Sequence, residues 1–319
     1  MYIAQGLTNK LPGCRVDVID KLPSPFGLIR FGVAPDHQTT KRVTRAFAKT
    51  LQSDGVRFLG NVEVGRDTSI KELQSIYDAV VLAYGAPYDN RLGIPGENKI
   101  NVFGSNAFVG WYNCHPEFLD LNPDLDVKAA AVIGLGNVAV DVARVLAKTK
   151  NEMSITDLAP YAGEAIEASP IQDIHIFGRR GPIEGAFTNV ELREMGHLEN
   201  CAPILDAAQL PDEVVAPKMS ERDLRLRTKN VETLRSFLDV SPEGKDKRLH
   251  FKFFASPVEV LGEDRVEGLR LEHTRVEDGR CIPTGETFEV ACGMVITCVG
   301  SRAEPIDGVP FDDRRGIVV

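Results

Sequence analysis

Residues 129–139 read AAAVIGLGNVA, and this stretch decides the fold. Its first five residues are small or branched and apolar, which is typical of a buried strand. They lead directly into the pattern G-x-G-x-x-A, where a helix is expected to begin. Gly134 permits a tight turn, Gly136 lets a phosphate approach the backbone, and Ala139 lets the helix pack on the strand. The stretch therefore predicts a dinucleotide-binding strand–turn–helix unit with a pyrophosphate at the helix N-terminus.

The next strand-like segment, IHIFGRRGP at residues 174–182, indicates which dinucleotide is bound. Sites for NAD usually have an acid at the end of this strand, whereas sites for NADP have arginine for the 2′-phosphate. Arg179 and Arg180 occupy the position of the acid, so the pattern favours NADP(H). They follow Gly136 by more than the roughly 20 residues that are usual, which we attribute to an inserted loop at 149–171. The alternative is a solvent-exposed turn that carries two arginines by chance.

Strands and helices alternate along most of the chain, which predicts parallel sheets and an α/β fold class with two doubly wound domains. In the first part we expect strands at 15–20, 56–59, 61–64 and 79–84 and helices at 38–53 and 69–75. In the second part we expect helices at 107–113 and 138–148 and strands at 129–133, 173–177, 249–254, 258–261, 266–274 and 293–299.

The composition excludes several classes of protein. Of the 319 residues, 43% are hydrophobic and 26% are charged, as in a globular protein, and the net charge of −9 argues against nucleic-acid binding. No apolar run approaches the roughly 18 residues that span a bilayer. The six cysteines form no C-x-x-C pair, which argues against a zinc ribbon, a cysteine-ligated cluster or a dithiol redox centre in this chain. We expect buried or unreactive thiols instead.

Six motifs give the chain a family resemblance. They are PFGLIRFGVAPDH at 25–37, GNVEVG at 60–65, AFVGWYN at 107–113, GLGNVAVDVAR at 134–144, GRRGP at 178–182 and AFTNVELREM at 186–195. In this order they resemble the adrenodoxin reductase family of ferredoxin–NADP reductases, which has the glutathione-reductase type of fold. The resemblance implies an oxidoreductase in which NADPH reduces a bound FAD and the flavin passes single electrons to an iron–sulfur protein.

The resemblance also implies domains and residue roles. Residues 1–105 would be the first part of an FAD-binding domain, 106–296 an NADP-binding domain, and 297–319 the start of the return to the FAD domain. FAD would contact Asp20, Leu28 and Val64, although the family usually has Glu in place of Asp20. The NADPH site would consist of Gly134, Leu135, Gly136, Asn137, Val138, Ala139, Arg179, Arg180 and Glu191.

His37 and Asp141 resemble a polar pair that lies near the flavin and the nicotinamide in the family. There they could tune the redox chemistry or relay protons. For His37, the alternative is a helix cap or a core residue with no part in the reaction.

The resemblance implies an acidic 2Fe-2S protein of the ferredoxin or adrenodoxin type as partner, so a basic patch is needed on this acidic chain. Between residues 218 and 235 the basic residues are Lys218, Arg222, Arg225, Arg227, Lys229 and Arg235, against Glu221, Asp223 and Glu232. If this segment is helical, Arg222, Arg225 and Lys229 share one face and could dock the partner. The alternative is an ordinary solvated helix face.

Two parts of the family pattern are not found within the 319 residues. The first FAD strand with its G-x-G-P-A-G turn would precede Tyr2, and the closing FAD segment would follow Val319. We therefore expect a fragment that binds FAD weakly and retains a complete NADP-binding part. We also expect a monomer located in a bacterial cytoplasm or a mitochondrial matrix.

Two rival interpretations remain open. One is a flavoprotein like the small subunit of glutamate synthase, which would need cysteine clusters near its N-terminus. The other is a nucleotide-binding module without catalytic activity.

Overall fold

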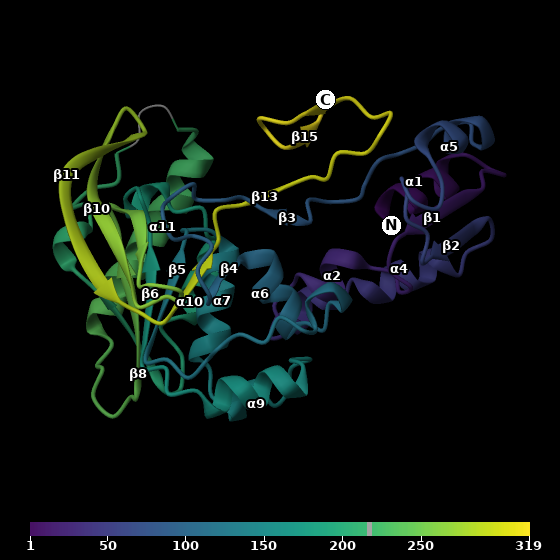
Figure 1. Ribbon diagram of the computed structural model, residues 1–319. Coiled ribbons are helices and arrows are strands. Elements are labelled where there is room, and N and C mark those ends of the chain that lie inside the picture. The colour runs from purple at the N-terminus through teal and green to yellow at the C-terminus, as the bar shows by residue number, and fades with distance from the viewer. Residues whose placement is uncertain (216–218) are drawn as a thin grey trace. The chain divides into compact units, whose positions relative to one another are not determined.

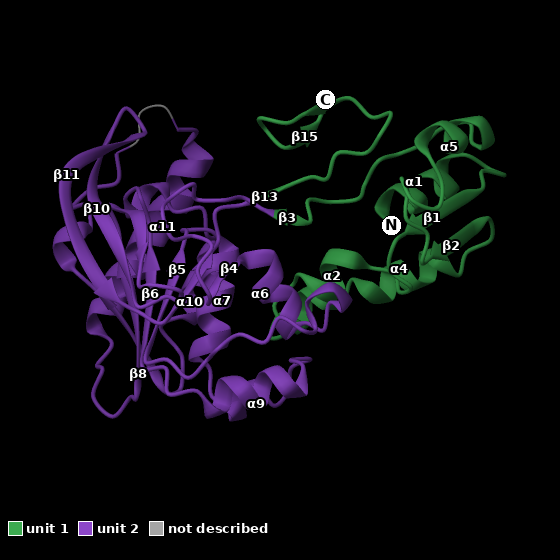
Figure 2. Ribbon diagram, viewed as in Figure 1, with its two compact units in different colours: residues 1–88, 301–319 green, residues 89–300 purple. Residues whose placement is uncertain are grey.

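The computed structural model describes residues 1–215 and 219–319. They form two compact units (Figure 2): unit 1 comprises Met1–Tyr88 and Ser301–Val319, and unit 2 comprises Asp89–Gly300. The chain passes between the units at β3 (Tyr88–Asp89) and β13 (Ser301–Arg302). The borders at residues 88/89 and 300/301 follow from where the chain packs on itself most closely. The assignment of FAD and NADP domains with borders at residues 105 and 296 stays a proposal about nucleotide binding.

A six-stranded parallel sheet forms the centre of unit 2 (Figure 1). Its strand order is β4-β12-β5-β6-β8-β7, and every neighbouring pair is parallel. The strands are β4 (Val102–Gly104), β5 (Ala129–Ile133), β6 (Asp173–Phe177), β7 (Cys201–Leu205), β8 (Lys247–Lys252) and β12 (Met294–Thr297). The α/β class is confirmed, and β5 and β6 have the predicted bounds.

Helices cover one face of this sheet. Helix α7 (Asn137–Ala147) packs against β5, β6 and β8, next to α6 (Ser105–Tyr112) and α10 (Asn189–Glu194). Val132, Ile176 and Phe251 point from the strands into the core on this side. The remaining helices of unit 2 are α8 (Lys150–Met153), α9 (Pro160–Ala168) and α11 (Glu221–Ser236), with short 3-10 turns at Pro116–Phe118, Pro182–Glu184, Ala207–Gln209 and Phe237–Asp239.

The segment 149–171, predicted as an inserted loop, contains α8 and α9. Helix α8 begins with a capping box in which the Thr149 hydroxyl accepts from the Glu152 N–H and the Glu152 carboxylate accepts from the Thr149 N–H. Helix α9 begins at Pro160, a residue that suits the first helical position. The insertion before the arginines is therefore helical in large part.

A three-stranded antiparallel sheet covers the opposite face of the parallel sheet. Its strands are β9 (Ala255–Leu261), β10 (Gly268–Glu277) and β11 (Arg280–Ala291), in the order β11-β10-β9. Figure 1 shows β10 and β11 as long curved strands beside the parallel sheet. Ile133 and Phe177 of the parallel sheet pack with Leu269 and Leu271 of β10 in a second core. Strand β11 was not predicted, because most of its residues are exposed and Pro283 and Gly285 interrupt its pattern.

In unit 1, β1 (Val16–Asp20) pairs in parallel with β2 (Val56–Gly60). The helices are α1 (Tyr2–Lys10), α2 (Gly27–Phe31), α3 (Gln38–Lys41), α4 (Thr44–Leu51) and α5 (Ile70–Ile76). Strand β14 (Phe311–Asp312) pairs antiparallel with β15 (Ile317–Val318). The helix predicted at 38–53 is thus divided into α3 and α4.

Two strands predicted in unit 1 are wrong. Residues 61–64 form no strand: Asn61 is in the left-handed region at φ +59°, and Val64 makes an isolated bridge to Thr68. In the described part of the chain no strand pairs with residues 79–84, where Val81 is 55% exposed. Branched apolar residues favour a strand, but a strand forms only where a neighbour accepts and donates its backbone hydrogen bonds.

The six cysteines are free thiols, of which Cys201 and Cys292 are buried and Cys114 is exposed. Among the described residues there is no helix with the length and apolarity that a membrane crossing requires.

Candidate dinucleotide site

The glycine turn, residues 134–139, follows β5. Its two glycines, Gly134 and Gly136, differ in why a glycine stands at each position. Gly134 has φ +142°, and a Cβ at this position would lie 2.3 Å from the main-chain oxygen of Cys298. Only glycine fits there. Gly136, by contrast, is the N-cap of α7 with φ −106°, and a Cβ there would meet no protein atom within 4 Å. Packing within the protein therefore does not explain Gly136, and the space beside it is open, as the predicted approach of a phosphate requires.

The N-terminus of α7 faces the same turn. No side chain caps this end of the eleven-residue helix. Its first N–H groups are thus available to an anion, and the helix dipole adds a partial positive charge. The turn and the helix end together form the kind of cradle that binds a pyrophosphate.

Residues 186–188 are hydrogen-bonded to the glycine turn. The Leu135 carbonyl accepts from the N–H of Ala186 at 2.6 Å and of Phe187 at 3.2 Å. The Thr188 N–H donates to Asn137 Oδ1 at 2.7 Å. Because α10 begins immediately after these residues, the contacts bring the AFTNVELREM motif to the glycine turn. The sequence motifs at 134–144 and 186–195 are therefore parts of one site.

The arginine turn, residues 178–181, follows β6 and lies next to the glycine turn. Ile133 of β5 pairs with Phe177 of β6, and the Gly134 N–H donates to the Phe177 carbonyl at 2.9 Å. A Cβ at Gly178 would lie 2.0 Å from Leu135 Cδ1, so glycine at this position lets the two turns pack together. Arg179 is exposed and Arg180 half-buried. Both guanidinium-bearing residues thus follow a strand next to the one that leads into the glycine turn, as the 2′-phosphate interpretation requires.

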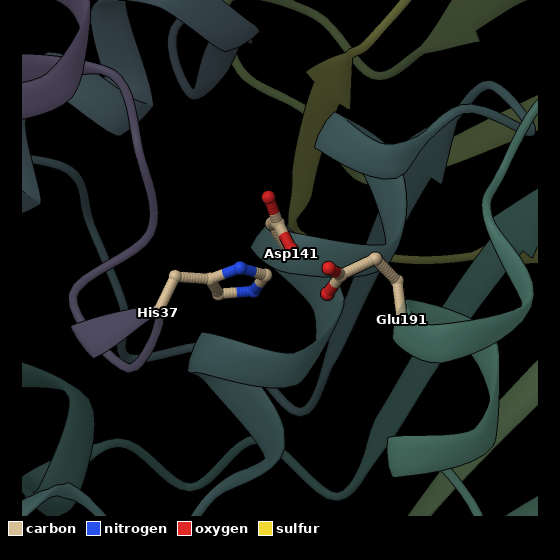
Figure 3. Close-up of side chains that lie close together, drawn as sticks. All are labelled: His37, Asp141 and Glu191. Carbon is tan, nitrogen blue, oxygen red and sulfur yellow. The ribbon is translucent and has the colours of Figure 1, made fainter. Parts of the chain in front are cut away.

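A buried arginine joins three acidic residues of unit 2. Arg144 on α7 is fully buried, and its guanidinium lies 2.8 Å from Asp141, 3.2 Å from Glu191 and 3.3 Å from Glu194. Figure 3 shows Asp141 on α7 and Glu191 on α10. The predictions did not include Arg144. Its i, i+3 spacing from Asp141 was a usable signal, but the contacts to Glu191 and Glu194 are long-range.

This arrangement has a physical consequence. A buried guanidinium is stable only when paired and hydrogen-bonded. Arg144 therefore ties α7 to α10 and fixes the carboxylates of Asp141 and Glu191, two residues predicted to act at the site.

A neutral thiol lies beside the glycine turn. The Cys298 carbonyl is the atom that a Gly134 side chain would strike. Burial raises the pKa of the Cys298 thiol, and the carboxylates of Asp89 and Asp141 raise it further. The thiol thus adds no negative charge near the place where phosphates would bind.

Unit 1 contains the residues predicted to contact FAD. Asp20 ends β1, its Oδ1 accepts from the Leu22 N–H at 2.9 Å, and its carbonyl accepts from the Val62 N–H at 3.1 Å. Val64 lies two residues beyond that contact, and Leu28 on α2 is 76% exposed. The contacts of Asp20 bring the 61–64 segment to the end of the first strand.

His37 is also in unit 1, at the N-cap position of α3, with Nε2 3.8 Å from Asp36 Oδ1. Its side chain makes no capping hydrogen bond to that helix. Since Asp141 belongs to unit 2, the predicted His37–Asp141 pair stays a proposal.

The basic segment, whose shared face depended on its being helical, contains helix α11. Arg222, Arg225 and Lys229 are exposed and line a hollow of about 440 Å³ together with Glu221 and Leu226. Arg225 also pairs with Glu221 at 3.3 Å. Lys218 lies outside the described residues.

Two other arginines of this segment support the fold instead. Arg227 donates to the Gly185 carbonyl, and Arg235 to the carbonyls of Pro211 and Asp212. The basic patch in unit 2 is therefore defined as Arg222, Arg225 and Lys229.

Comparisons with known proteins place these features in a family. No family model matches the chain. Over 332 residues it is 42% identical to the mitochondrial NADPH:adrenodoxin oxidoreductase of Bos taurus, covering 99% of this chain and 67% of the bovine protein. Over 308 residues it is 40% identical to the NADPH-ferredoxin reductase FprA of Mycobacterium tuberculosis, covering 95% of this chain and 67% of FprA.

A solved structure of M. tuberculosis FprA in complex with NADPH matches with a TM-score of 0.92 at 38% identity, covering 99% of this chain and 71% of the FprA chain. The chain spans about two thirds of the length of the curated relatives. The resemblance inferred from the six motifs is confirmed: this chain belongs to the family of NADPH:adrenodoxin oxidoreductases and NADPH-ferredoxin reductases.

Proposed function

We propose that this chain takes part in electron transfer from NADPH through FAD to an iron–sulfur protein of the ferredoxin or adrenodoxin type. The observation that carries the proposal is the pair of adjacent turns at one edge of the parallel sheet. One turn presents an uncapped helix end and an open glycine, and the other presents two arginines. Phosphate recognition accounts for both.

In the NADPH site, residues Gly134–Ala139 and the α7 N-terminus bind the pyrophosphate. Arg179 and Arg180 bind the 2′-phosphate, which NADH lacks. Glu191 faces the bound dinucleotide from α10, held in place by Arg144. Asp141 is fixed by the same guanidinium.

The FAD site uses unit 1. Within the described residues, Asp20 Oδ1 is occupied by the Leu22 N–H, which leaves Oδ2 to accept from an adenosine ribose hydroxyl. Leu28 and Val64 supply apolar contact. FAD, when bound, accepts two electrons as hydride and releases them singly. His37 and Asp141 tune that chemistry or move protons, and the domain roles of residues 1–105, 106–296 and 297–319 are as assigned from the sequence.

The basic patch on α11 docks the acidic iron–sulfur partner. Such a patch raises the encounter rate and makes it sensitive to ionic strength. We propose a monomeric reductase in a bacterial cytoplasm or a mitochondrial matrix.

The first experiment tests the nucleotide assignment on the chain supplied with FAD. Replacing both arginines (Arg179→Ala with Arg180→Ala) should raise the Kd for NADPH at least about 100-fold, because two charge-assisted hydrogen-bonding groups are lost at ~1.5–3 kcal/mol each. The Kd for NADH should stay constant. A control that removes two exposed arginines elsewhere in unit 2, Arg248→Ala with Arg265→Ala, should leave both constants unchanged. An unaltered preference for NADPH in the first variant contradicts the assignment.

The second experiment tests the partner. Reversing the basic patch (Arg222→Glu, Arg225→Glu, Lys229→Glu) should slow NADPH-driven, ferredoxin-dependent cytochrome c reduction and spare ferricyanide reduction, which needs no docking. The matched control, Lys150→Glu with Arg248→Glu and Arg265→Glu, changes the net charge equally. Equal losses of both activities in the patch variant, or equal effects of patch and control variants, refute the docking role. No flavin binding and no NADPH-dependent reduction would favour a non-catalytic module.

A further inference from the structure

The antiparallel sheet holds the main chain of the arginine turn. The Gly178 carbonyl accepts from the Ala255 N–H at 2.9 Å, and the Arg180 carbonyl accepts from the Phe254 N–H at 3.1 Å. The Arg179 carbonyl accepts from two side chains, the Thr274 hydroxyl at 2.8 Å and the Cys281 thiol at 3.0 Å. Three successive carbonyls of the turn therefore accept hydrogen bonds from residues between Phe254 and Cys281, which lie far away in the sequence.

Thr274 has no evident reason to be polar other than this contact. It lies on β10 and is 7% exposed, and the other buried residues of this strand, Gly268, Leu269 and Leu271, carry no polar side chain. Its N–H donates to the Phe254 carbonyl at 2.9 Å, and its hydroxyl donates to Arg179. A β-branched valine would fill the same space. The hydroxyl is thus explained by the arginine turn alone.

The far end of the turn is fixed as well. Phe254 adopts a left-handed conformation at φ +55°, and a Cβ at Gly181 would lie 2.6 Å from the Phe254 ring. The Gly181 N–H donates to Glu184 Oε2 at 3.0 Å. The backbone that carries both arginines is therefore constrained at each residue from Gly178 to Gly181.

We propose that Thr274 is a positioning residue for recognition of the 2′-phosphate, and that its hydroxyl, aided by the Cys281 thiol, sets the preference for NADPH over NADH. The proposal rests on the nucleotide assignment made above. Arginine side chains are long and flexible, so a loose turn would have to be ordered at the moment of binding, which weakens affinity. A turn ordered during folding avoids that cost. NADH lacks the 2′-phosphate and therefore makes no such contact with the arginine turn. The affinity for NADH should not depend on whether the turn is ordered before binding.

The test uses the FAD-supplied chain and the fragment 2′,5′-ADP, which carries the 2′-phosphate, with 5′-AMP as its unphosphorylated counterpart. Thr274→Val should raise the Kd for 2′,5′-ADP and the KM for NADPH by about three- to ten-fold, the effect of one lost hydrogen bond. The Kd for 5′-AMP, the KM for NADH and kcat should not change. Thr274→Ser, which keeps the hydroxyl, should restore the parent values. The double variant, Thr274→Val with Cys281→Ala, should raise the Kd for 2′,5′-ADP more than Thr274→Val alone.

Thr297→Val is the matched control. Thr297 is also 7% exposed, but its hydroxyl donates to the Phe103 carbonyl at 3.3 Å instead of the arginine turn. This variant should bind 2′,5′-ADP normally. If Thr274→Val does not fold, Cys281→Ala and Cys281→Ser test the same carbonyl, with loss and retention of its second donor.

The outcomes separate the two proposals. If replacing Arg179 and Arg180 abolishes the preference for 2′,5′-ADP while neither Thr274→Val nor the Cys281 variants alter it, the positioning role is wrong and the phosphate site stands. If the arginine replacement also leaves the preference unchanged, the phosphate site itself is wrong. An equal weakening of 5′-AMP and 2′,5′-ADP would show a general loss of structure and would overturn the positioning role.

Discussion

The two glycines of the 134–139 turn should respond in opposite ways to the same added methyl group. Gly134→Ala should destabilise the fold, whereas Gly136→Ala should spare the fold and weaken dinucleotide binding. The difference follows from what each Cβ would meet: a main-chain oxygen at 2.3 Å for Gly134, and no protein atom within 4 Å for Gly136.

The magnitude for Gly134→Ala has two contributions. A non-glycine residue at φ +142° costs about 1–3 kcal/mol, and the overlap with the Cys298 carbonyl requires a backbone shift that costs about 1–3 kcal/mol more. The total of about 2–6 kcal/mol should lower the thermal midpoint by about 3–9 °C in a chain of this size.

For Gly136→Ala the stability terms nearly cancel. Alanine reduces the entropy of the unfolded chain, by about 0.4–1 kcal/mol, but is a poorer N-cap than glycine. The thermal midpoint should therefore move little. The methyl group would occupy the space through which a phosphate approaches the N-terminus of α7, so the Kd for NADPH should rise at least about ten-fold.

The assays are thermal unfolding without nucleotide and titration with NADPH, performed on both variants. Normal NADPH affinity in Gly136→Ala would refute the assignment of that open space to a phosphate. An unchanged midpoint in Gly134→Ala would refute the steric argument for the turn.

Two further predictions concern titration and thiol reactivity. Burial, assisted by the charges of His250 and Lys252, lowers the pKa of His175 to about 4. Because the unfolded value is about 6.5, the unfolded chain binds more protons between these two pH values, so stability is complete above about pH 6.5 and falls as the pH drops towards 4. Between pH 7 and pH 5 the free energy of unfolding, measured in urea, should fall by about 2 kcal/mol less in His175→Phe than in the parent. An identical fall in parent and variant would contradict this. Burial also raises the pKa of Cys201 and Cys292 to about 12 each. In the folded chain both should resist iodoacetamide at pH 8 while exposed Cys114 reacts, as read by mass spectrometry, and fast labelling of either buried thiol would count against the fold.

Some elements could be predicted from the sequence because their signals are local. The bounds of β5 and β6 and the start of α7 follow from apolar runs that end at glycine. The helix α11 was considered only as a condition for a basic face, and its docking role stays a proposal. Residues 79–84 show the limit of such signals, because their apolar pattern did not produce a strand without a hydrogen-bonded neighbour in the described chain.

The sequence by itself determined the fold class, the family and the set of residues proposed to bind NADPH, since each depends on residue type at short spacing. Only the tertiary structure decided that a β9–β11 sheet covers the second face of the parallel sheet and supports the arginine turn. It also decided that Arg144 joins Asp141 to Glu191. Thr274 and Arg179 lie 95 residues apart, and Arg144 and Glu191 lie 47 apart. No periodicity within one helix or strand encodes such contacts, because they arise when separate elements pack and their buried polar groups must find partners.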